Sequence, residues 1–346
     1  MCGIFGIFNP IGVGGIEYSI EAILGALSHR GPDSKGYWVE PRGRLAFGHT
    51  RLAIQDLSSA AAQPFLSSSG RSVIVFNGEI YNHLELRRLA PHISWKTHSD
   101  TETLIELIEF LGVEKTLNLI RGMYAAAFWD KVKCELTLFR DRFGEKSLYV
   151  GKFNGGWVFS SELRAINKIH GFNAEIDRFV LADYLQTGYV SGASCIYSGF
   201  FKVEPGTILK IQSASSELKK QKYYSYEQQY ISASKNRHFL RDDEAILATE
   251  NLLKNAVSLQ TISDVPVGGF LSGGIDSSLV CAMLVDTLER KLETFTIGFT
   301  DDHYDESKFA SAVAKHLGTN HNELMVSGHD ALEVIPRLNT IYDEPF

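Results

Sequence analysis

The chain begins with Met1-Cys2-Gly3-Ile4-Phe5-Gly6-Ile7-Phe8, the first eight of 346 residues, and this stretch sets the expectation for the first half of the chain. Removal of Met1 would make Cys2 the first residue, which then carries both a thiol and a free α-amine. Their unperturbed pKa values are about 8.5 and about 8, so one residue can supply a nucleophile and its general base. The apolar run that follows predicts a core strand, which would fix this terminus. A cysteine at this position can also be accidental, so the decision rests on the motifs that follow.

The composition is that of a globular protein with an acidic balance. The chain is 44% hydrophobic and 22% charged, its formal net charge is −7, and its length allows roughly two domains, each with its own core. The acidic balance argues against nucleic acid or an anionic membrane as a partner. No apolar stretch approaches the ~20 residues that span a bilayer, and the start lacks the basic region of a signal peptide. These features favour a cytoplasmic enzyme.

The cysteines and histidines give no sign of a structural metal site. The four cysteines are scattered and include no C-x-x-C pair, and the eleven histidines lack metal-ligand spacing. The spacing of the cysteines does not match a disulfide framework either. The four are Cys2, Cys134, Cys195 and Cys281.

The first half combines several β-like segments with amphipathic helices. The helices are predicted over 16–29, 101–111 and 181–186. The strands are predicted over 49–56, 71–76, 124–129, 135–139, 147–153 and 156–160. This number of strands favours stacked sheets flanked by helices. The polar segment 213–238 is predicted to be a linker.

Three positions of the first half have the chemistry to complete a site around Cys2. Arg51 carries a planar guanidinium that grips a carboxylate through two hydrogen bonds, although a strand arginine is often only a surface charge. Asn77 and Gly78 follow a strand, which is first of all a turn signal, but an amide and a glycine N–H can also form an oxyanion hole. Asp100 can cap the helix that follows it, hold a ligand ammonium, or do both.

A loop rich in serine and glycine lies at the centre of the second half. Residues 272–278 read Ser-Gly-Gly-Ile-Asp-Ser-Ser, between an apolar strand and a helix predicted from about 277 to 290. Glycines admit phosphate oxygens close to the backbone, and a helix start offers unpaired N–H groups to an anion. Asp276 is placed to hold Mg²⁺ against the same phosphates. The loop lacks the lysine of a Walker A motif, so we expect a phosphate-binding loop of another class, with a plain turn as the alternative.

The elements after this loop predict a parallel sheet. Strands at 293–299 and 322–326 are separated by a helix at 307–317, which completes a β-α-β-α-β pattern. Doubly wound parallel sheets bind nucleotides at the carboxyl ends of their strands. Ile297 falls at such an end, where it either lines a nucleotide site or packs as a core residue.

Ordered motifs run through the whole chain: M-C-G-I at the start, R-G-P-D at 30–33, H-T-R-L-A-I at 49–54, N-G-E-I-Y-N at 77–82, S-D-T-E at 99–102, R-D-R-F-G at 140–144, S-G-G-I-D-S-S at 272–278 and Y-D-E-S at 304–307. In this order they resemble the glutamine-hydrolysing asparagine synthetases of the AsnB type, in which a class II glutamine amidotransferase is fused to an ATP-pyrophosphatase ligase domain. The resemblance implies a two-domain α/β fold. It comprises an αββα sandwich of the N-terminal nucleophile hydrolases over 2–212, a linker over 213–238, and part of a doubly wound nucleotide-binding domain over 239–346.

The same resemblance implies the roles of individual residues. Cys2 is the implied amidase nucleophile with its α-amine as the base, and Asn77 with Gly78 forms the oxyanion hole. Arg51 binds the α-carboxylate of glutamine, while Glu79 and Asp100 receive its α-ammonium. The implied ATP site, with Asp276 beside the magnesium pyrophosphate, comprises Leu271, Ser272, Gly273, Gly274, Asp276, Ser277 and Ile297.

The implied reaction makes asparagine from aspartate. Glutamine hydrolysis releases ammonia, ATP converts the acceptor carboxylate into an acyl-adenylate with release of pyrophosphate, and ammonia then displaces AMP. ATP and Mg²⁺ are the implied cofactors, and glutamine and aspartate are the implied small-molecule partners. An internal channel would carry the ammonia, and a homodimer stays open.

The sequence departs from the family pattern in three places. Glu145 and Ser147 replace the usual apolar residue and proline, and Tyr124-Ala125-Ala126-Ala127 lightens a core run. Family members also continue past the position of Phe346, through an acidic S-G-E-G-x-D-E loop, which implies a truncated synthetase half. Two alternatives therefore stay open: a related amidotransferase with another acceptor, such as a uronic acid in polysaccharide synthesis, and a chain that acts only as a glutaminase or as a nucleotide-binding regulatory module.

Overall fold

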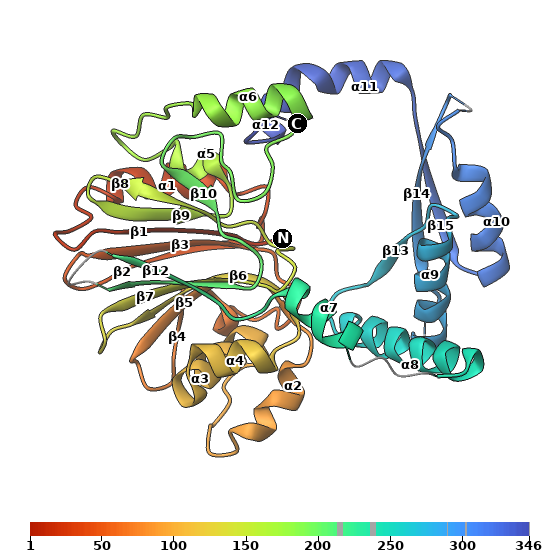
Figure 1. Cartoon of the computed structure of the whole chain (residues 1–346), viewed down its shortest axis with the longest axis horizontal. Helices are drawn as coiled ribbons and strands as arrows, with labels where there is room; N and C mark the ends of the chain where they lie inside the picture. Colours follow the sequence, from red (N-terminus) through yellow and green to blue (C-terminus); the bar gives the residue numbers. More distant parts are fainter. Residues whose placement is uncertain (213–216, 236–239, 289, 302, 346) are drawn as a thin grey trace. The chain divides into compact units, whose positions relative to one another are not determined.

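Two compact units make up the computed structural model, which describes residues 1–212, 217–235, 240–288, 290–301 and 303–345. The first unit comprises Met1–Asn236 together with Asp343–Phe346, and the second comprises Arg237–Tyr342. Figure 1 shows that both combine strands with helices, as the predicted two-domain α/β class requires.

Two six-stranded sheets form the first unit, and every strand pair in them is antiparallel. The first sheet contains β1 (Gly3–Phe8), β2 (Ser34–Val39), β3 (Leu45–Arg51), β8 (Tyr149–Phe153), β9 (Gly156–Ser160) and β10 (Phe200–Lys202). The second contains β4 (Phe65–Leu66), β5 (Ser72–Ile80), β6 (Gly122–Asp130), β7 (Glu135–Arg140), β11 (Thr207–Gln212) and β12 (Leu218–Lys222). The strand orders are β10-β8-β9-β1-β3-β2 and β12-β11-β7-β6-β5-β4.

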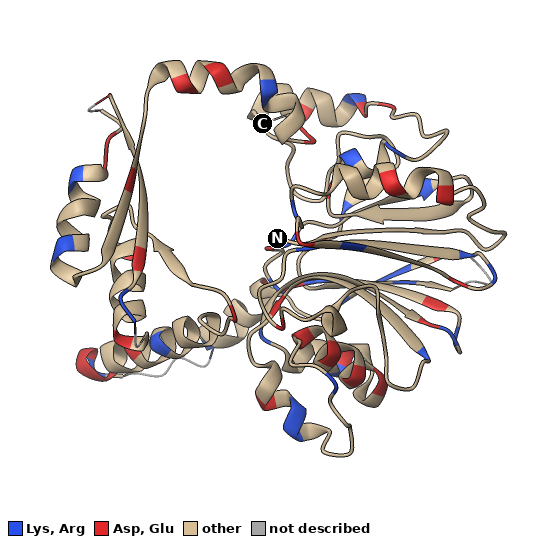
Figure 2. Cartoon of the chain, turned by 180° about the vertical axis from the view of Figure 1, so that it is seen from behind, with Lys and Arg blue, Asp and Glu red and all other residues tan. Residues whose placement is uncertain are grey.

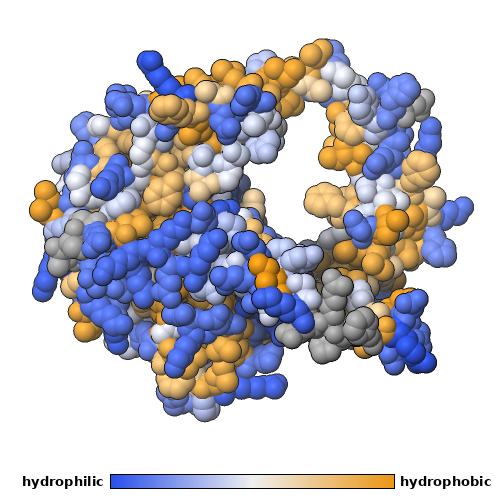
Figure 3. All heavy atoms as spheres, viewed as in Figure 1, coloured by the Kyte–Doolittle hydropathy of each residue, from blue (hydrophilic) through white to orange (hydrophobic). Residues whose placement is uncertain are grey.

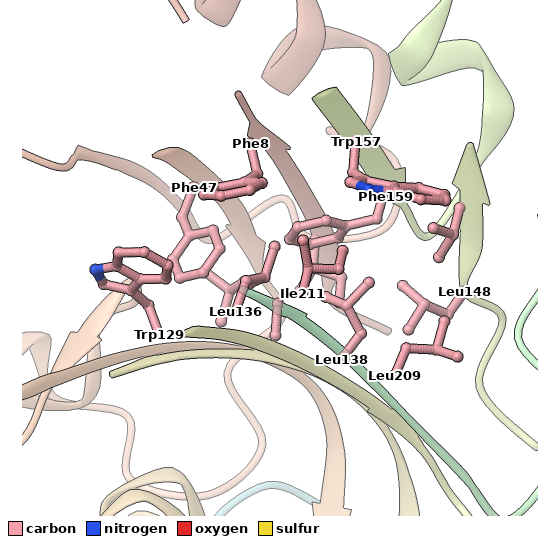
Figure 4. Packing of buried hydrophobic residues seen from close by; sticks show 14 of the residues in the cluster. Phe8, Phe47, Trp129, Leu136, Leu138, Leu148, Trp157, Phe159, Leu209 and Ile211 are labelled. Atoms are coloured by element: carbon pink, nitrogen blue, oxygen red, sulfur yellow. The ribbon is translucent and has the colours of Figure 1, made fainter. Parts of the chain in front are cut away.

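Large apolar side chains fill the space between these two sheets (Figure 4). Phe8 and Phe47 come from the first sheet, and Trp129 and Leu138 come from the second. The Phe8 and Trp129 rings lie 5.9 Å apart. Full burial of side chains of this size contributes about 1.5–3 kcal/mol each, so this layer is a large part of the stability of the unit.

Helices cover the outer faces of both sheets and complete the four layers of the expected αββα sandwich (Figure 1). On the first sheet, Ile23 and Leu24 of α1 (Glu17–Ala26) pack in one cluster with Phe5 of β1. Because β1 is covered on both faces, all six of its residues are buried, which explains its uninterrupted apolar run. On the second sheet, Leu104 of α3 (Asp100–Leu111) packs in one cluster with Phe76 of β5.

Shorter helices complete the first unit. They are α2 (His83–Leu86), α4 (Val113–Leu119), α5 (Leu163–Ile166), α6 (Arg178–Thr187) and α7 (Tyr226–Lys235), with 3₁₀ turns η1 (Ser59–Ala61) and η2 (Arg87–Leu89).

The Asn77-Gly78 pair does not form a turn. Both residues lie inside β5, where Gly78 pairs with Tyr124 of β6. A Cβ atom on Gly78 would lie 2.2 Å from the Met123 carbonyl oxygen. The glycine therefore serves the close approach of two strands, which is the other common reason for a glycine inside a strand.

The segment 213–238, which we expected to be a linker, contains regular structure where it is described. Leu218–Lys222 is β12, which pairs with β11 at the edge of the second sheet, and Tyr226–Lys235 is α7. The polar composition belongs to an exposed edge strand, where lysines are favoured, and not to an irregular connection. Residues 213–216 and 236–238 of this segment lie outside the described residues.

Three parallel strands form the sheet of the second unit, as predicted. They are β13 (Gly268–Phe270), β14 (Glu293–Phe299) and β15 (Asn320–Val326), paired in that order. Helices α9 (Ile275–Thr287) and α10 (Ser307–Leu317) pack on one face around Leu271, Cys281 and Ala310. The remaining elements are α8 (Asp242–Gln260), α11 (Gly328–Val334), η3 (Ile335–Arg337) and α12 (Leu338–Ile341).

The parallel strands also expose large apolar side chains. Along β14 the buried positions hold Thr294, Thr296 and Gly298, while the alternate positions are exposed. The exposed apolar residues are Phe270, Phe295, Ile297, Phe299, Leu324 and Met325. Figure 3 shows hydrophobic side chains at the surface of this unit, and a cluster of this kind is typical of a surface that packs against further protein.

Charge is distributed without a dominant basic region. Figure 2 shows acidic and basic residues interspersed along the elements of both units, in keeping with the net charge of −7. Among the described residues, none of the helices has the length and apolar character that crossing a bilayer requires.

Candidate functional site

Cys2 lies directly before β1 and is held on two sides. The pairing of β1 with β3 opposes Gly3 to Thr50 and so brings Leu52 to the thiol. The N–H of Leu52 donates to Cys2 Sγ at 3.4 Å, and Arg30 Nε donates to the Cys2 carbonyl at 2.9 Å. The protein therefore fixes the thiol in place by contacts to both its sulfur and its backbone.

Burial shifts the thiol and the terminal amine in opposite directions. It raises the pKa of the Cys2 thiol, and the Leu52 N–H opposes this shift. Burial also lowers the pKa of the α-amine, which belongs to Met1 in the 346-residue sequence. The negative charge of the Cys2 thiolate opposes this second shift. A protonated thiol beside an amine that gives up its proton readily is the pairing that general-base activation needs.

The side chain of Asn77 is buried and unsatisfied. It is 1% exposed, and neither Oδ1 nor Nδ2 has a hydrogen-bond partner among the described residues. An unpaired buried polar group costs about 1–3 kcal/mol. A water molecule or a ligand can supply the missing partner.

Glu79 and Asp100 place two carboxylates close together. The N–H of Ile80 donates to Asp100 Oδ2 at 2.8 Å, and Gln55 Nε2 donates to Glu79 Oε2 at 2.6 Å. Burial and then repulsion by Asp100 raise the pKa of Glu79 to about 8, and burial raises the pKa of Asp100 to about 6. Two carboxylates this close repel each other when both are ionised. A ligand group with a positive charge relieves that repulsion, so the pair favours a cationic ligand group.

Arg51 ends β3, and its guanidinium donates to the loop that follows. NH1 donates to the Ser58 carbonyl at 2.8 Å, and NH2 donates to the carbonyls of Gln55, at 3.4 Å, and Asp56. The side chain is only 8% exposed, so the reading of Arg51 as a surface charge is wrong. These three bonds use three of the five N–H donors of Arg51, so a ligand carboxylate can bind the other donors or replace some of these carbonyl groups.

One cavity brings together five of the six residues predicted for the first half. Its lining includes Cys2, Arg51, Gly78, Glu79 and Asp100, whereas Asn77, which lies in β5 between the lining residues Phe76 and Gly78, does not line it. The cavity measures about 20 Å³, which is space for about one water molecule. An amino-acid ligand therefore requires the loop after β3 to move.

Sequence reasoning assigned no role to Arg30, Gln55 or Lys146, which all belong to this region. Arg30 stands in the R-G-P-D motif, and that motif was the only signal for it. Lys146 is 5% exposed. Burial, and after it the positive charge of Arg30, lowers the pKa of the Lys146 ammonium, and the negative charge of Glu79 opposes this shift. The contact of Gln55 depends on the path of a loop, for which the sequence has no local signal.

In the second unit, the loop between β13 and α9 is held by its own serines. Ser272 N donates to Ser277 Oγ at 3.2 Å, and the two hydroxyl oxygens lie 3.0 Å apart. Gly273 has a φ of +82°, and a Cβ atom there would lie 2.7 Å from Ala310 N. Gly274 is the N-cap of α9, so the first N–H groups of this helix are directed toward the loop.

The other predicted residues of this loop region differ in exposure. Leu271 is buried, its N–H donates to the Phe295 carbonyl at 2.9 Å, and its carbonyl accepts from Thr296 Oγ1, so both backbone polar groups are engaged within the sheet. Ile297 is 55% exposed, on the face of β14 that also exposes Phe295 and Phe299.

Asp276 lies in the first turn of α9. The described residues contain no group of three or more His, Cys, Asp or Glu side chains that could hold a metal ion. A single carboxylate beside phosphate oxygens is nevertheless a donor set that Mg²⁺ accepts.

Comparison with known proteins divides the chain in the same way. Residues 1–224 match the model of the glutamine amidotransferase domain family, and residues 248–346 match that of the asparagine synthase family. The putative asparagine synthetase [glutamine-hydrolyzing] 2 of Methanocaldococcus jannaschii is 33% identical over 100% of this chain and 69% of its own length. Asparagine synthetase [glutamine-hydrolyzing] 1 of Bacillus subtilis is 31% identical over 100% of this chain and 53% of its own length.

A solved structure supports the fold. The allosteric regulatory enzyme of purine biosynthesis aligns with 94% of this chain and 80% of its own, with a TM-score of 0.51 and 16% sequence identity. At this identity the similarity concerns the fold alone.

Proposed function

Because the chain belongs to the family of glutamine-hydrolysing asparagine synthetases, we propose that its first unit hydrolyses glutamine at Cys2 and that its second unit binds ATP. The observation that supports this most directly is the buried Asn77 amide, which lacks a partner among the described residues. An oxyanion formed by attack of Cys2 on an amide would accept a hydrogen bond from Asn77 Nδ2.

In the proposed hydrolysis, Cys2 Sγ attacks the side-chain amide carbon of glutamine. The α-amine that Met1 removal frees accepts the thiol proton and passes it to the leaving ammonia. Asn77 Nδ2 and the N–H of Gly78 stabilise the oxyanion. The resulting thioester reacts with water, which releases glutamate and restores the thiol.

Glutamine would be oriented by charge at both of its polar ends. Arg51 pairs with the α-carboxylate, and Glu79 with Asp100 receives the α-ammonium. Each of these side chains now bonds to groups of the chain itself. Binding therefore exchanges internal hydrogen bonds for bonds to glutamine.

We assign ATP binding to the loop of residues 271–277 and to Ile297. Backbone N–H groups at the start of α9 suit a phosphate, and Gly273 allows the close approach. Asp276 would hold Mg²⁺, which neutralises charge on the phosphates when it is bound. The acceptor carboxylate would attack the α-phosphate, and pyrophosphate would leave.

Aspartate is the proposed acceptor, with asparagine as the product. The chain spans 69% and 53% of the two relatives described above, so the activity of the whole protein on aspartate is a proposal. A different carboxylate such as a uronic acid, or glutamine hydrolysis alone, is the second candidate. The domain limits of 2–212 and 239–346, a cytoplasmic location and a homodimer also stay predictions.

Glutamine hydrolysis is the direct test. Release of glutamate and ammonia should be measured with the 346-residue chain after its intact mass has shown that Met1 is absent. The Cys2→Ala variant should fall to the background rate. Cys134→Ser is the matched control, since Cys134 lies on the β6–β7 hairpin and should leave the rate unchanged. Equal rates for the parent and Cys2→Ala would contradict the assignment.

The acceptor is tested separately. ATP, ammonia and a candidate acid are supplied together, and pyrophosphate is measured. Release that depends on aspartate, with asparagine as the product, supports the first candidate. Release that depends on a uronic acid, or glutamine hydrolysis without any pyrophosphate, favours the second.

A further inference from the structure

Side chains of alternating charge connect Cys2 to a segment far along the chain. Arg30 Nε donates to the Cys2 carbonyl at 2.9 Å, and Arg30 NH1 donates to Glu162 Oε1 at 2.8 Å. Arg164 Nε lies 2.9 Å from Glu162 Oε2 and donates to Asp343 Oδ1 at 2.7 Å. The network therefore runs without a gap from the nucleophile residue to Asp343.

Glu344 fixes the same segment to the first unit. It accepts hydrogen bonds from Tyr149 OH at 3.0 Å and from the N–H of Ile196 at 2.9 Å, and it pairs with Lys202 Nζ at 2.7 Å. The side chains of Asp343 and Glu344 are each 9% exposed. Residues 343–346 belong to the first unit, although 237–342 form the second. Asp343 and Glu344 therefore hold the segment that follows the second unit against the first unit through their two carboxylates.

Arg164 lies between two acceptors, and the direction of its Nε–H distinguishes them. That N–H donates to Asp343 and also lies 2.9 Å from Glu162 Oε2, an oxygen that His29 Nε2 approaches at 3.1 Å. If Asp343 leaves, the Arg164 N–H can turn fully to Glu162. The pairing of Glu162 with Arg164 would then strengthen at the expense of its hydrogen bond with Arg30.

The buried charge of Asp343 depends on this arrangement. Burial raises the pKa of the Asp343 carboxyl, and the charge of Arg164 opposes that shift. A buried ion is costly when its partner is removed. The ion pair with Arg164 therefore offsets the cost of burying the Asp343 carboxylate.

We propose that docking of Asp343–Glu344 holds Cys2 in its position for glutamine hydrolysis, with Arg164, Glu162 and Arg30 as the positioning residues that transmit it. This inference rests on the proposed function of Cys2.

The first test compares kinetic constants of variants. Asp343→Asn combined with Glu344→Gln removes both charges and keeps the side-chain size. We expect kcat for glutamine hydrolysis to fall at least about fivefold, because a displaced nucleophile loses its alignment. KM for glutamine should stay within about twofold, since Arg51, Glu79 and Asp100 are outside the network. Asp343→Glu keeps the charge and should retain most of kcat.

The second test does not need turnover. Iodoacetamide alkylation of Cys2 and Cys134 is followed by peptide mass mapping. In the double variant, Cys2 should react at least about threefold faster because its thiol is less confined, while Cys134 keeps the parent rate. Unchanged kcat together with unchanged Cys2 alkylation would overturn the inference. A parent chain that does not hydrolyse glutamine defeats the proposed function instead, and alkylation still decides the coupling.

A matched control separates this effect from lost stability. Asp130→Asn breaks the ion pair of Asp130 with Arg71, which has an N···O distance of 2.5 Å and lies outside the network. This variant should unfold at a lower temperature and keep the parent kcat. An equal fall of kcat in Asp130→Asn would assign the effect to stability and contradict the inference.

Discussion

Gln55 Nε2 donates a hydrogen bond to Glu79 Oε2 at 2.6 Å, in the cavity that Cys2 and Arg51 also line. The loop after β3 also supplies the carbonyl groups that accept from Arg51. Arg51 and Glu79, at the two ends of the proposed glutamine site, therefore already have hydrogen-bond partners within the chain. Hydrogen bonds to charged groups contribute about 1.5–3 kcal/mol, so this loop competes with glutamine.

Removal of the Gln55 amide should strengthen glutamine binding. In a Cys2→Ala background, where turnover stops, Gln55→Ala should lower the Kd for glutamine about three- to tenfold, because Glu79 no longer has an internal partner. Calorimetric titration measures the constant. Weaker binding in Gln55→Ala would show that Gln55 contacts glutamine and does not compete with it.

The pH dependence of binding follows from the two carboxyl groups. Since the pKa of Glu79 is raised to about 8 and that of Asp100 to about 6, the pair holds a proton near neutral pH that an incoming ammonium must displace. We expect the affinity for glutamine to rise about tenfold between about pH 6 and about pH 8, with proton release on binding. Titration in buffers of different ionisation enthalpy counts the protons, and Glu79→Gln should abolish most of this dependence.

The same shifts predict a stability effect of fixed sign. A carboxyl group whose folded pKa lies above its unfolded value stabilises the fold below the unfolded pKa, and this contribution is lost as pH rises through the folded pKa. Without glutamine, Tm should therefore fall between about pH 6 and about pH 8. Glu79→Gln should flatten this part of the Tm profile. An unliganded Tm that rises over this range in the parent but not in the variant contradicts the shift.

Replacement of Asn77 should separate catalysis from stability. Asn77→Ala removes an oxyanion donor, so kcat should fall about 10²–10³-fold with a small change in KM. The variant also removes a buried amide that has no partner among the described residues, so the free energy of unfolding should not fall by more than about 1 kcal/mol. Denaturant unfolding and steady-state kinetics measure both quantities. A strongly destabilised variant with normal kcat would assign Asn77 a structural role.

Gly273 provides a test of the ATP loop. Gly273→Ala places a Cβ atom against Ala310 N in a left-handed conformation, so nucleotide binding should weaken at least about tenfold. Gly328→Ala is the matched control, because a Cβ atom at Gly328 meets open space. It should leave nucleotide binding unchanged and stabilise α11. Equal binding by both variants would contradict the role of Gly273.

Periodicity predicted most of the elements because each of them buries one fixed face in an apolar cluster. The apolar stripe of α1 and the parallel strand β14 fall where the sequence places them, since burial on fixed faces determines both patterns. The turn signal at Asn77-Gly78 was misleading, because glycine is favoured both in a turn and where two strands approach each other closely. The Arg30–Glu162–Arg164 network had no signal, because residues more than 100 positions apart meet only through the tertiary fold.

The central claim is that Cys2, freed from Met1, forms a covalent bond with the γ-acyl group of glutamine. The chain should be mixed with glutamine, quenched in acid within the first turnovers, and mapped by mass spectrometry. We expect a glutamyl thioester on an N-terminal Cys2, in a chain that lacks Met1, with Cys134, Cys195 and Cys281 unmodified. Hydrolysis by a chain that retains Met1, or an adduct on any other residue, would contradict it.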